Sequence, residues 1–128
     1  MAWAFKSTVP IYYQIVEEIT ARIFDGRYPP GAKIPTVRDI AEEAAVNPNT
    51  VQRAFSELEN SGLIITMRTA GRVVTTDSAV IQSAKNAFTQ RAAGEFLADM
   101  ENRGITAGEL LEIFGQLIKQ NGKGDEHG

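Results

Sequence analysis

The sequence has 128 residues, 43% hydrophobic and 23% charged, which suits one globular domain with an appendage. It contains no cysteine, which excludes disulfides and cysteine-ligated zinc, and its single histidine is His127. No apolar run approaches the roughly 20 residues that cross a bilayer, and the N-terminus lacks the layout of a secretory signal. We therefore expect a cytoplasmic protein with no membrane, metal or cofactor partner.

The net charge of -3 is unevenly distributed along the chain. Residues 1–76 hold eight Lys or Arg and eight Asp or Glu, a balance of zero, whereas residues 77–128 hold five against eight. A basic domain is the usual sign of a nucleic-acid-binding protein. The neutral first part can still bind DNA if its basic side chains share one face.

Residues 10–24 are predicted to form a helix. Pro10 suits the first helical position, and apolar residues follow at helical spacing. They are Ile11, Ile15, Ile19 and Ile23. Asp25-Gly26 ends the helix, because glycine readily takes the left-handed conformation there. The segment 32–34 is too short for a helix, so we expect it to be an extended strand edge.

Two further helices, joined by a tight turn at 45–46, are predicted over 37–44 and 48–61. Thr36 and Asp39 have the spacing of a capping box at the start of the first. Asn47 suits the N-cap of the second, with Pro48 at its first helical position. This arrangement is typical of a helix-turn-helix.

Winding the second of these helices at about 100° per residue separates an apolar face from a polar one. The apolar face consists of Val51, Ala54, Phe55 and Leu58. The polar face consists of Asn49, Gln52, Arg53, Ser56 and Asn60. It contains no carboxylate, which phosphates would repel, so we expect it to enter a major groove.

Residues 63–76 are predicted to form a β-hairpin. Apolar and β-branched runs at 63–67 and 73–75 flank a connection at 68–72. Arg68 and Arg72 in this connection suggest a wing that contacts the DNA backbone. Both are also ordinary residues for a hairpin tip.

Residues 77–121 are predicted to form a helical hairpin for dimerisation, followed by a disordered tail over 122–128. Thr106 and Glu109 form a capping box at the start of the second helix. That helix carries a stripe of Leu110, Ile113, Phe114 and Leu117, widened by Leu111 and Ile118. One partner helix cannot cover so many apolar residues, so we expect a two-fold partner to do so.

Several motifs, in order and with the right gaps, closely resemble the DNA-binding domain of the GntR family over residues 10 to about 76. They include Pro10-Ile11-Tyr12, Gly26-Arg27-Tyr28-Pro29-Pro30-Gly31, Ile34-Pro35-Thr36-Val37-Arg38-Asp39 and Val46-Asn47-Pro48-Asn49-Thr50-Val51. The resemblance implies a mainly α winged helix-turn-helix with a small β-hairpin wing, which binds a palindromic operator as a homodimer, commonly as a repressor. The short C-terminal helical extension is similar to that of the YtrA-type branch, which lacks a large effector domain.

The resemblance also assigns DNA contacts by position. Arg38 matches the family's DNA-contacting arginine at the start of its second helix. The recognition-helix positions match Asn47, Asn49, Thr50 and Gln52. Gly71 matches a wing glycine, whereas Met67 and Thr69 depart from the usual wing residues.

Local alternatives exist for several of these side chains. Arg38 is spaced to pair with Glu42, and Arg53 with Glu57, one helical turn away. Asn47 is a helix cap in any case.

The sequence does not favour catalysis, because it lacks cysteine, a histidine outside the tail and a glycine-rich phosphate loop after a strand. The alternative to a DNA-binding regulator is a winged-helix protein-interaction module without DNA affinity. A ligand sensor is less consistent with the chain, since two helices hardly enclose a usual ligand pocket. The identity of any small-molecule effector stays open.

Overall fold

The computed structural model describes residues 3–125, with side-chain surroundings for residues 3–122. Its elements are α1 (Ile11–Phe24), α2 (Val37–Ala44), α3 (Pro48–Asn60), β1 (Ile64–Met67), β2 (Gly71–Val74), α4 (Ser78–Asn102) and α5 (Ala107–Asp125). By its contacts the chain divides into two compact units, Met1–Asn86 and Ala87–Gly128.

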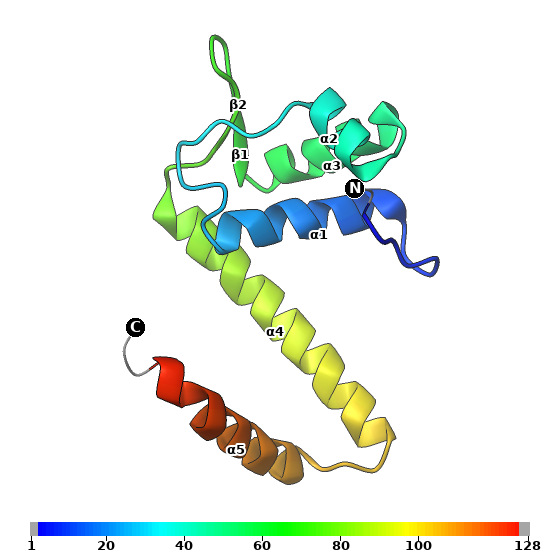
Figure 1. Cartoon of the computed structure of the whole chain (residues 1–128), viewed down its shortest axis with the longest axis vertical. Helices are drawn as coiled ribbons and strands as arrows, with labels where there is room; N and C mark the ends of the chain where they lie inside the picture. Colours follow the sequence, from blue (N-terminus) through cyan, green and yellow to red (C-terminus); the bar gives the residue numbers. More distant parts are fainter. Residues whose placement is uncertain (1–2, 126–128) are drawn as a thin grey trace. The chain divides into compact units, whose positions relative to one another are not determined.

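In the first unit, α1 lies along α3, and α2 packs on α3 to complete the helix-turn-helix (Figure 1). Three isoleucines of the α1 stripe, Ile15, Ile19 and Ile23, are buried, whereas Ile11 at its start is 42% exposed. The core continues through α3 and the base of the wing. Its largest members besides the α1 residues are Phe55, Ile40, Leu58, Ile64, Val51 and Val74.

The helix starts form as the sequence predicts. Thr36 accepts a hydrogen bond from the backbone of Asp39, whose carboxylate accepts one from the backbone of Thr36. Asn47 caps α3 by accepting from the backbone N–H of Asn49. Each cap is a contact within four residues, which is why sequence alone can identify it.

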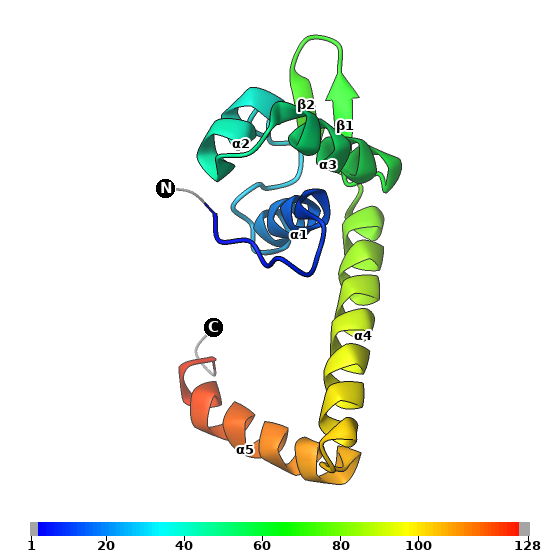
Figure 2. The same ribbon diagram turned by 90° about the vertical axis from the view of Figure 1, so that its right-hand side faces the viewer.

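The wing is an antiparallel hairpin in which Ile64 pairs with Val74 and Met67 with Gly71 (Figure 2). β2 begins earlier than the predicted 73, so the connection is shortened to residues 68–70. On its other edge β2 bonds to the extended segment before α2: Ile34 N–H donates to the Arg72 carbonyl at 3.0 Å. The segment at 32–34 therefore is the extended edge that its length suggested.

Helix α4 starts at Ser78, and its first turns belong to the winged unit. Val80, Ile81 and Ala84 pack against the core of that unit. The boundary between the units thus falls after Asn86, later than the 76/77 boundary expected from the sequence.

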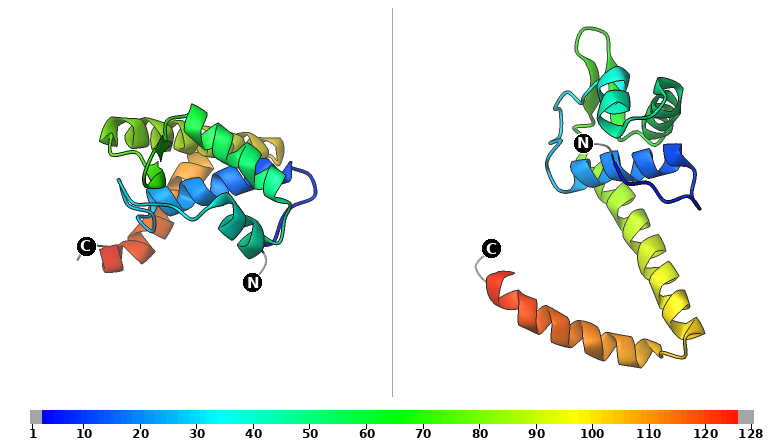
Figure 3. Two further views of the ribbon diagram at one scale, coloured as in Figure 1. Left: turned by 90° about the horizontal axis from the view of Figure 1, so that it is seen from above. Right: turned by 45° about the vertical axis from the view of Figure 1, so that its right-hand side comes forward.

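The second unit contains the remainder of α4 and all of α5, which leaves α4 through a turn at 103–106 (Figure 3). The predicted capping box forms here, with Glu109 N–H donating to Thr106 Oγ1 at 3.1 Å and the Glu109 carboxylate accepting from Thr106 N–H at 2.9 Å. These bonds lower the pKa of Glu109. Helix α5 continues to Asp125, past the predicted start of the tail at 122. The rest of that predicted tail, 126–128, lies outside the described residues.

Candidate nucleic-acid interface

The outer face of α3 is polar and free of carboxylates, as the helical spacing predicts. Val51, Ala54, Phe55 and Leu58 are buried, and the opposite side exposes Asn49, Gln52, Arg53, Ser56 and Asn60. Ser56 turns its hydroxyl back onto the Gln52 carbonyl at 3.1 Å. The side chain of Gln52 has no partner within the described part of the chain, so its amide is available to an external ligand.

Arg53 is held against α1. Its guanidinium carbon lies 3.8 Å from the centroid of the Tyr12 ring, a cation–π arrangement. The alternative ion pair with Glu57 does not form among the described residues. The structure thus fixes the Arg53 cation on the outer face with a partner that no local spacing indicates.

A hollow of about 360 Å³ adjoins this stacked pair. It is lined by Ile11, Tyr12, Asn49, Thr50 and Arg53. Three predicted DNA-contact residues therefore share one concave surface with Tyr12 of α1. None of these five lining residues carries a carboxylate, and Arg53 contributes a cation.

Arg38 is exposed on the first turn of α2. Within residues 3–122 it makes neither a hydrogen bond nor an ion pair, so the local pairing with Glu42 is not formed. Its neighbour Asp39 is occupied by the capping box. The Arg38 guanidinium is therefore free to contact an external group.

The wing places its two arginines differently. Gly71 has φ +76°, a left-handed conformation that favours glycine and closes the three-residue connection. Arg68 lies exposed in that connection, without a partner in the described part of the chain.

Arg72 does not lie at the tip, and that prediction is wrong. Because β2 begins at Gly71, Arg72 stands in the strand opposite Thr66. Its side chain is 25% exposed and bends back to α3, with Nε 3.6 Å from the Glu59 carboxylate and the guanidinium carbon 5.1 Å from the Phe55 ring centroid.

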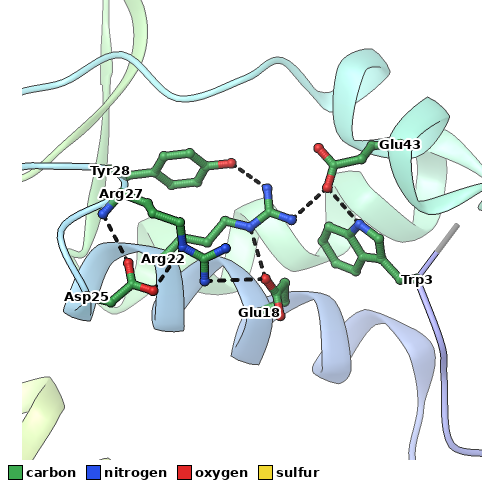
Figure 4. Close-up of polar contacts among 7 residues, drawn as sticks. All are labelled: Trp3, Glu18, Arg22, Asp25, Arg27, Tyr28 and Glu43. Atoms are coloured by element: carbon green, nitrogen blue, oxygen red, sulfur yellow. Dashed lines mark hydrogen bonds and ion pairs between the residues drawn. The ribbon is translucent and has the colours of Figure 1, made fainter. Parts of the chain in front are cut away.

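A polar cluster joins α1 and α2, and the sequence did not predict it (Figure 4). Arg22 of α1 donates to Glu43 of α2 at 2.6 Å, to Glu18 at 3.0 Å and to the Tyr28 hydroxyl at 2.7 Å. Trp3 Nε1 donates to the same Glu43 carboxylate at 2.7 Å. Glu43 thus links α2 and the N-terminal segment to Arg22 of α1.

The cluster shifts the pKa values of Arg22 and Glu43 in opposite directions. The hydrogen bond to Glu43 raises the pKa of Arg22, and the Arg22 and Trp3 donors lower the pKa of Glu43. Both shifts favour the charged pair. The cluster therefore fixes the position of α2, and with it Arg38, at neutral pH.

Among the described residues, no three His, Cys, Asp or Glu side chains gather in a way that could hold a metal ion. None of the helices in residues 3–125 combines the length and apolar character that a membrane span requires.

The family model of the bacterial regulatory proteins of the gntR family matches residues 11–74. The chain belongs to the GntR family. It is 36% identical to the HTH-type transcriptional regulator YhcF of Bacillus subtilis over 108 residues, which cover 84% of this chain and 89% of YhcF. It is 31% identical to the HTH-type transcriptional repressor YtrA of the same organism, covering 84% of this chain and 83% of YtrA.

Solved structures agree with this GntR assignment. A GntR family transcriptional regulator from Listeria monocytogenes superposes with a TM-score of 0.79 and 34% identity, covering 88% of this chain and 98% of that one. The DNA-binding domain of AraR, solved in complex with operator ORX1, gives a TM-score of 0.51 and 28% identity, covering 59% of this chain and 93% of the domain.

The GntR assignment confirms the predicted winged helix-turn-helix with two C-terminal helices and the short, YtrA-type architecture. The chain is a DNA-binding transcriptional regulator and not an enzyme.

Proposed function

We propose that this GntR-family chain represses transcription by binding a palindromic operator as a homodimer, in the cytoplasm where the chromosome is accessible. The observation that carries the dimer is the apolar surface of α5. Leu111 is 74% exposed, Ile118 68% and Phe114 43%. Soluble monomers rarely leave such a surface in water.

Only part of this surface is covered within its own unit. Leu110 is buried, and Phe114 lies 5.9 Å from Phe96 of α4, ring centroid to ring centroid. Ile113 and Leu117 are 49% and 45% exposed. A second copy that offers the same stripe would cover these side chains in a closed two-fold dimer, the commonest oligomer.

We propose that each protomer presents α3 to a major groove. Base edges would be read by Arg38, Asn49, Thr50 and Gln52, and the backbone contacted by Asn47, Arg53, Arg68 and the glycine turn at Gly71. The carboxylate-free outer face of α3 supports this placement. The repressor role rests on the relatives, since YtrA is named a repressor.

Selection from a random duplex library tests the operator. An inverted repeat is expected, with half-site centres about 10 bp apart or a multiple of that spacing. Recovery of sequences without two-fold symmetry would refute the palindrome. If the protein binds no duplex even at low salt, the result would favour the alternative function, a winged-helix protein-interaction module without DNA affinity.

Phe114→Glu tests the dimer surface, because the new charge would lose its water at a two-chain interface. A monomer is expected by light scattering, with a far-ultraviolet circular dichroism spectrum that still shows a folded helical chain. Gln116→Glu adds the same charge at an exposed polar position of α5 and should remain a dimer. If Phe114→Glu also remains a dimer, the contact lies elsewhere.

A further inference from the structure

We propose that Glu59, Thr66 and Arg72 form a clasp that holds the wing against the recognition helix, so that Glu59 and Arg72 position the wing for DNA and do not contact it. This inference rests on the proposed DNA-binding function. It assigns Arg72 a task different from the phosphate contact that its place in the sequence suggested.

One carboxylate joins three elements in this clasp. Glu59 lies in the last turn of α3, Thr66 in β1 and Arg72 in β2. The Thr66 hydroxyl donates to Glu59 Oε2, and the same oxygen lies 3.6 Å from Arg72 Nε. Thr66 and Arg72 are also directly opposed in the hairpin. Both strands are therefore tied to α3 through one side chain.

Beyond the backbone bond from Ile34 N–H to the Arg72 carbonyl, the outer half of the wing has few contacts to hold it. Ile64 and Val74 are buried at its base, but residues 65–67 of β1 are all exposed. An isolated two-stranded hairpin is marginal in water. The clasp supplies contacts to α3 beyond the last buried pair, and these contacts set the direction in which the Arg68 turn points.

Arg72 is poorly placed to leave the clasp. Its Nε is buried beside the Glu59 carboxylate, and its charge is balanced by that carboxylate and by the face of Phe55. Reaching a phosphate would break that ion pair and leave Glu59 uncompensated. Arg72 also offsets the charge of the Glu59 carboxylate in the last turn of α3.

The matched variants are Arg72→Met and Arg68→Met. Each removes one wing cation and keeps an apolar stem, but only Arg72 belongs to the clasp. Binding to a fluorescein-labelled duplex of mixed sequence is measured by anisotropy across a salt series. Log affinity falls as log salt rises, and the slope is the steepness of that fall. Each lost phosphate contact lowers this slope by about one.

We expect Arg68→Met to lower this slope by about one. Arg72→Met should keep the wild-type slope and weaken binding severalfold at every salt concentration. In the free protein, amide hydrogen exchange at 65–67 and 71–73 should accelerate in Arg72→Met and Glu59→Gln but not in Arg68→Met. The double variant Glu59→Gln/Arg72→Met should exchange no faster than Arg72→Met, because both changes open the same clasp.

The clasp is overturned if Arg72→Met lowers the slope as Arg68→Met does and leaves hairpin exchange unchanged. If the wild type binds no duplex at any salt concentration, the proposed function fails instead. The exchange measurements need no DNA, so in that case they still decide whether the clasp holds the wing.

Discussion

Replacing Ala45 by glycine should stabilise the protein, although alanine is the better helix former. Ala45 follows α2 with φ 59° and ψ 49°, and it is the one non-glycine residue with positive φ in the described chain. Its N–H donates to the Glu42 carbonyl at 3.3 Å, and Val46 N–H donates to the Ala41 carbonyl at 3.0 Å. This is the bonding of a Schellman motif, in which glycine is usual at the left-handed position.

The magnitude follows from two opposing terms. The left-handed conformation costs a residue with a Cβ about 1–2 kcal/mol. Glycine costs about 0.5–1 kcal/mol more than alanine in backbone entropy. Ala45→Gly should therefore raise the free energy of unfolding by about 0.5–1 kcal/mol, because Ala45 is exposed and loses no packing.

Urea unfolding followed by circular dichroism measures this change, at one fixed protein concentration because the stability of the proposed dimer would depend on concentration. The midpoint should rise with an unchanged m-value. Ala21→Gly is the matched control: Ala21 is exposed within α1, so glycine there should cost about 0.5–1 kcal/mol. Equal destabilisation by both substitutions would show that Ala45 does not hold the left-handed turn.

Three further outcomes are expected. Arg38→Ala should cost about 1–3 kcal/mol of affinity for a selected operator and relax preference at one position per half-site; an equal loss for every sequence would make Arg38 a phosphate anchor. Because Arg22 and Trp3 lower the pKa of Glu43 below its ordinary 4.5, this carboxylate stabilises the fold above that pH, and the contribution is lost as pH falls through the folded pKa. Glu43→Gln should therefore flatten the acid decline in unfolding free energy, measured by urea titrations at several pH values; an unaltered decline would contradict the shift. Thr106→Ala should cost about 0.5–2 kcal/mol by removing the cap of α5, seen as a lower midpoint in thermal unfolding, whereas Ser83→Ala, at an exposed position within α4, should change the midpoint little.

Local chemistry accounts for most of the fold that the sequence predicted. The caps at Thr36, Asn47 and Thr106 join residues no more than three apart. The buried faces of α1 and α3 follow from helical spacing alone. Such features need no knowledge of which elements meet, and the ordered motifs built on them were sufficient to indicate the GntR family.

Side-chain partners between elements were decided by the tertiary structure. Arg53 had a local candidate in Glu57 but stacks on Tyr12, and Arg22 binds Glu43 on another helix. Arg72 was expected at a free tip but lies in β2 and pairs with Glu59.

The physical reason is the same in each case. By itself the sequence determined the helices, their caps, the helix-turn-helix and the carboxylate-free face of α3, because these depend on spacing within one element. Only the tertiary structure decided which cations remain available to DNA, because a long cationic side chain takes whichever carboxylate or aromatic ring the packing of other elements brings beside it.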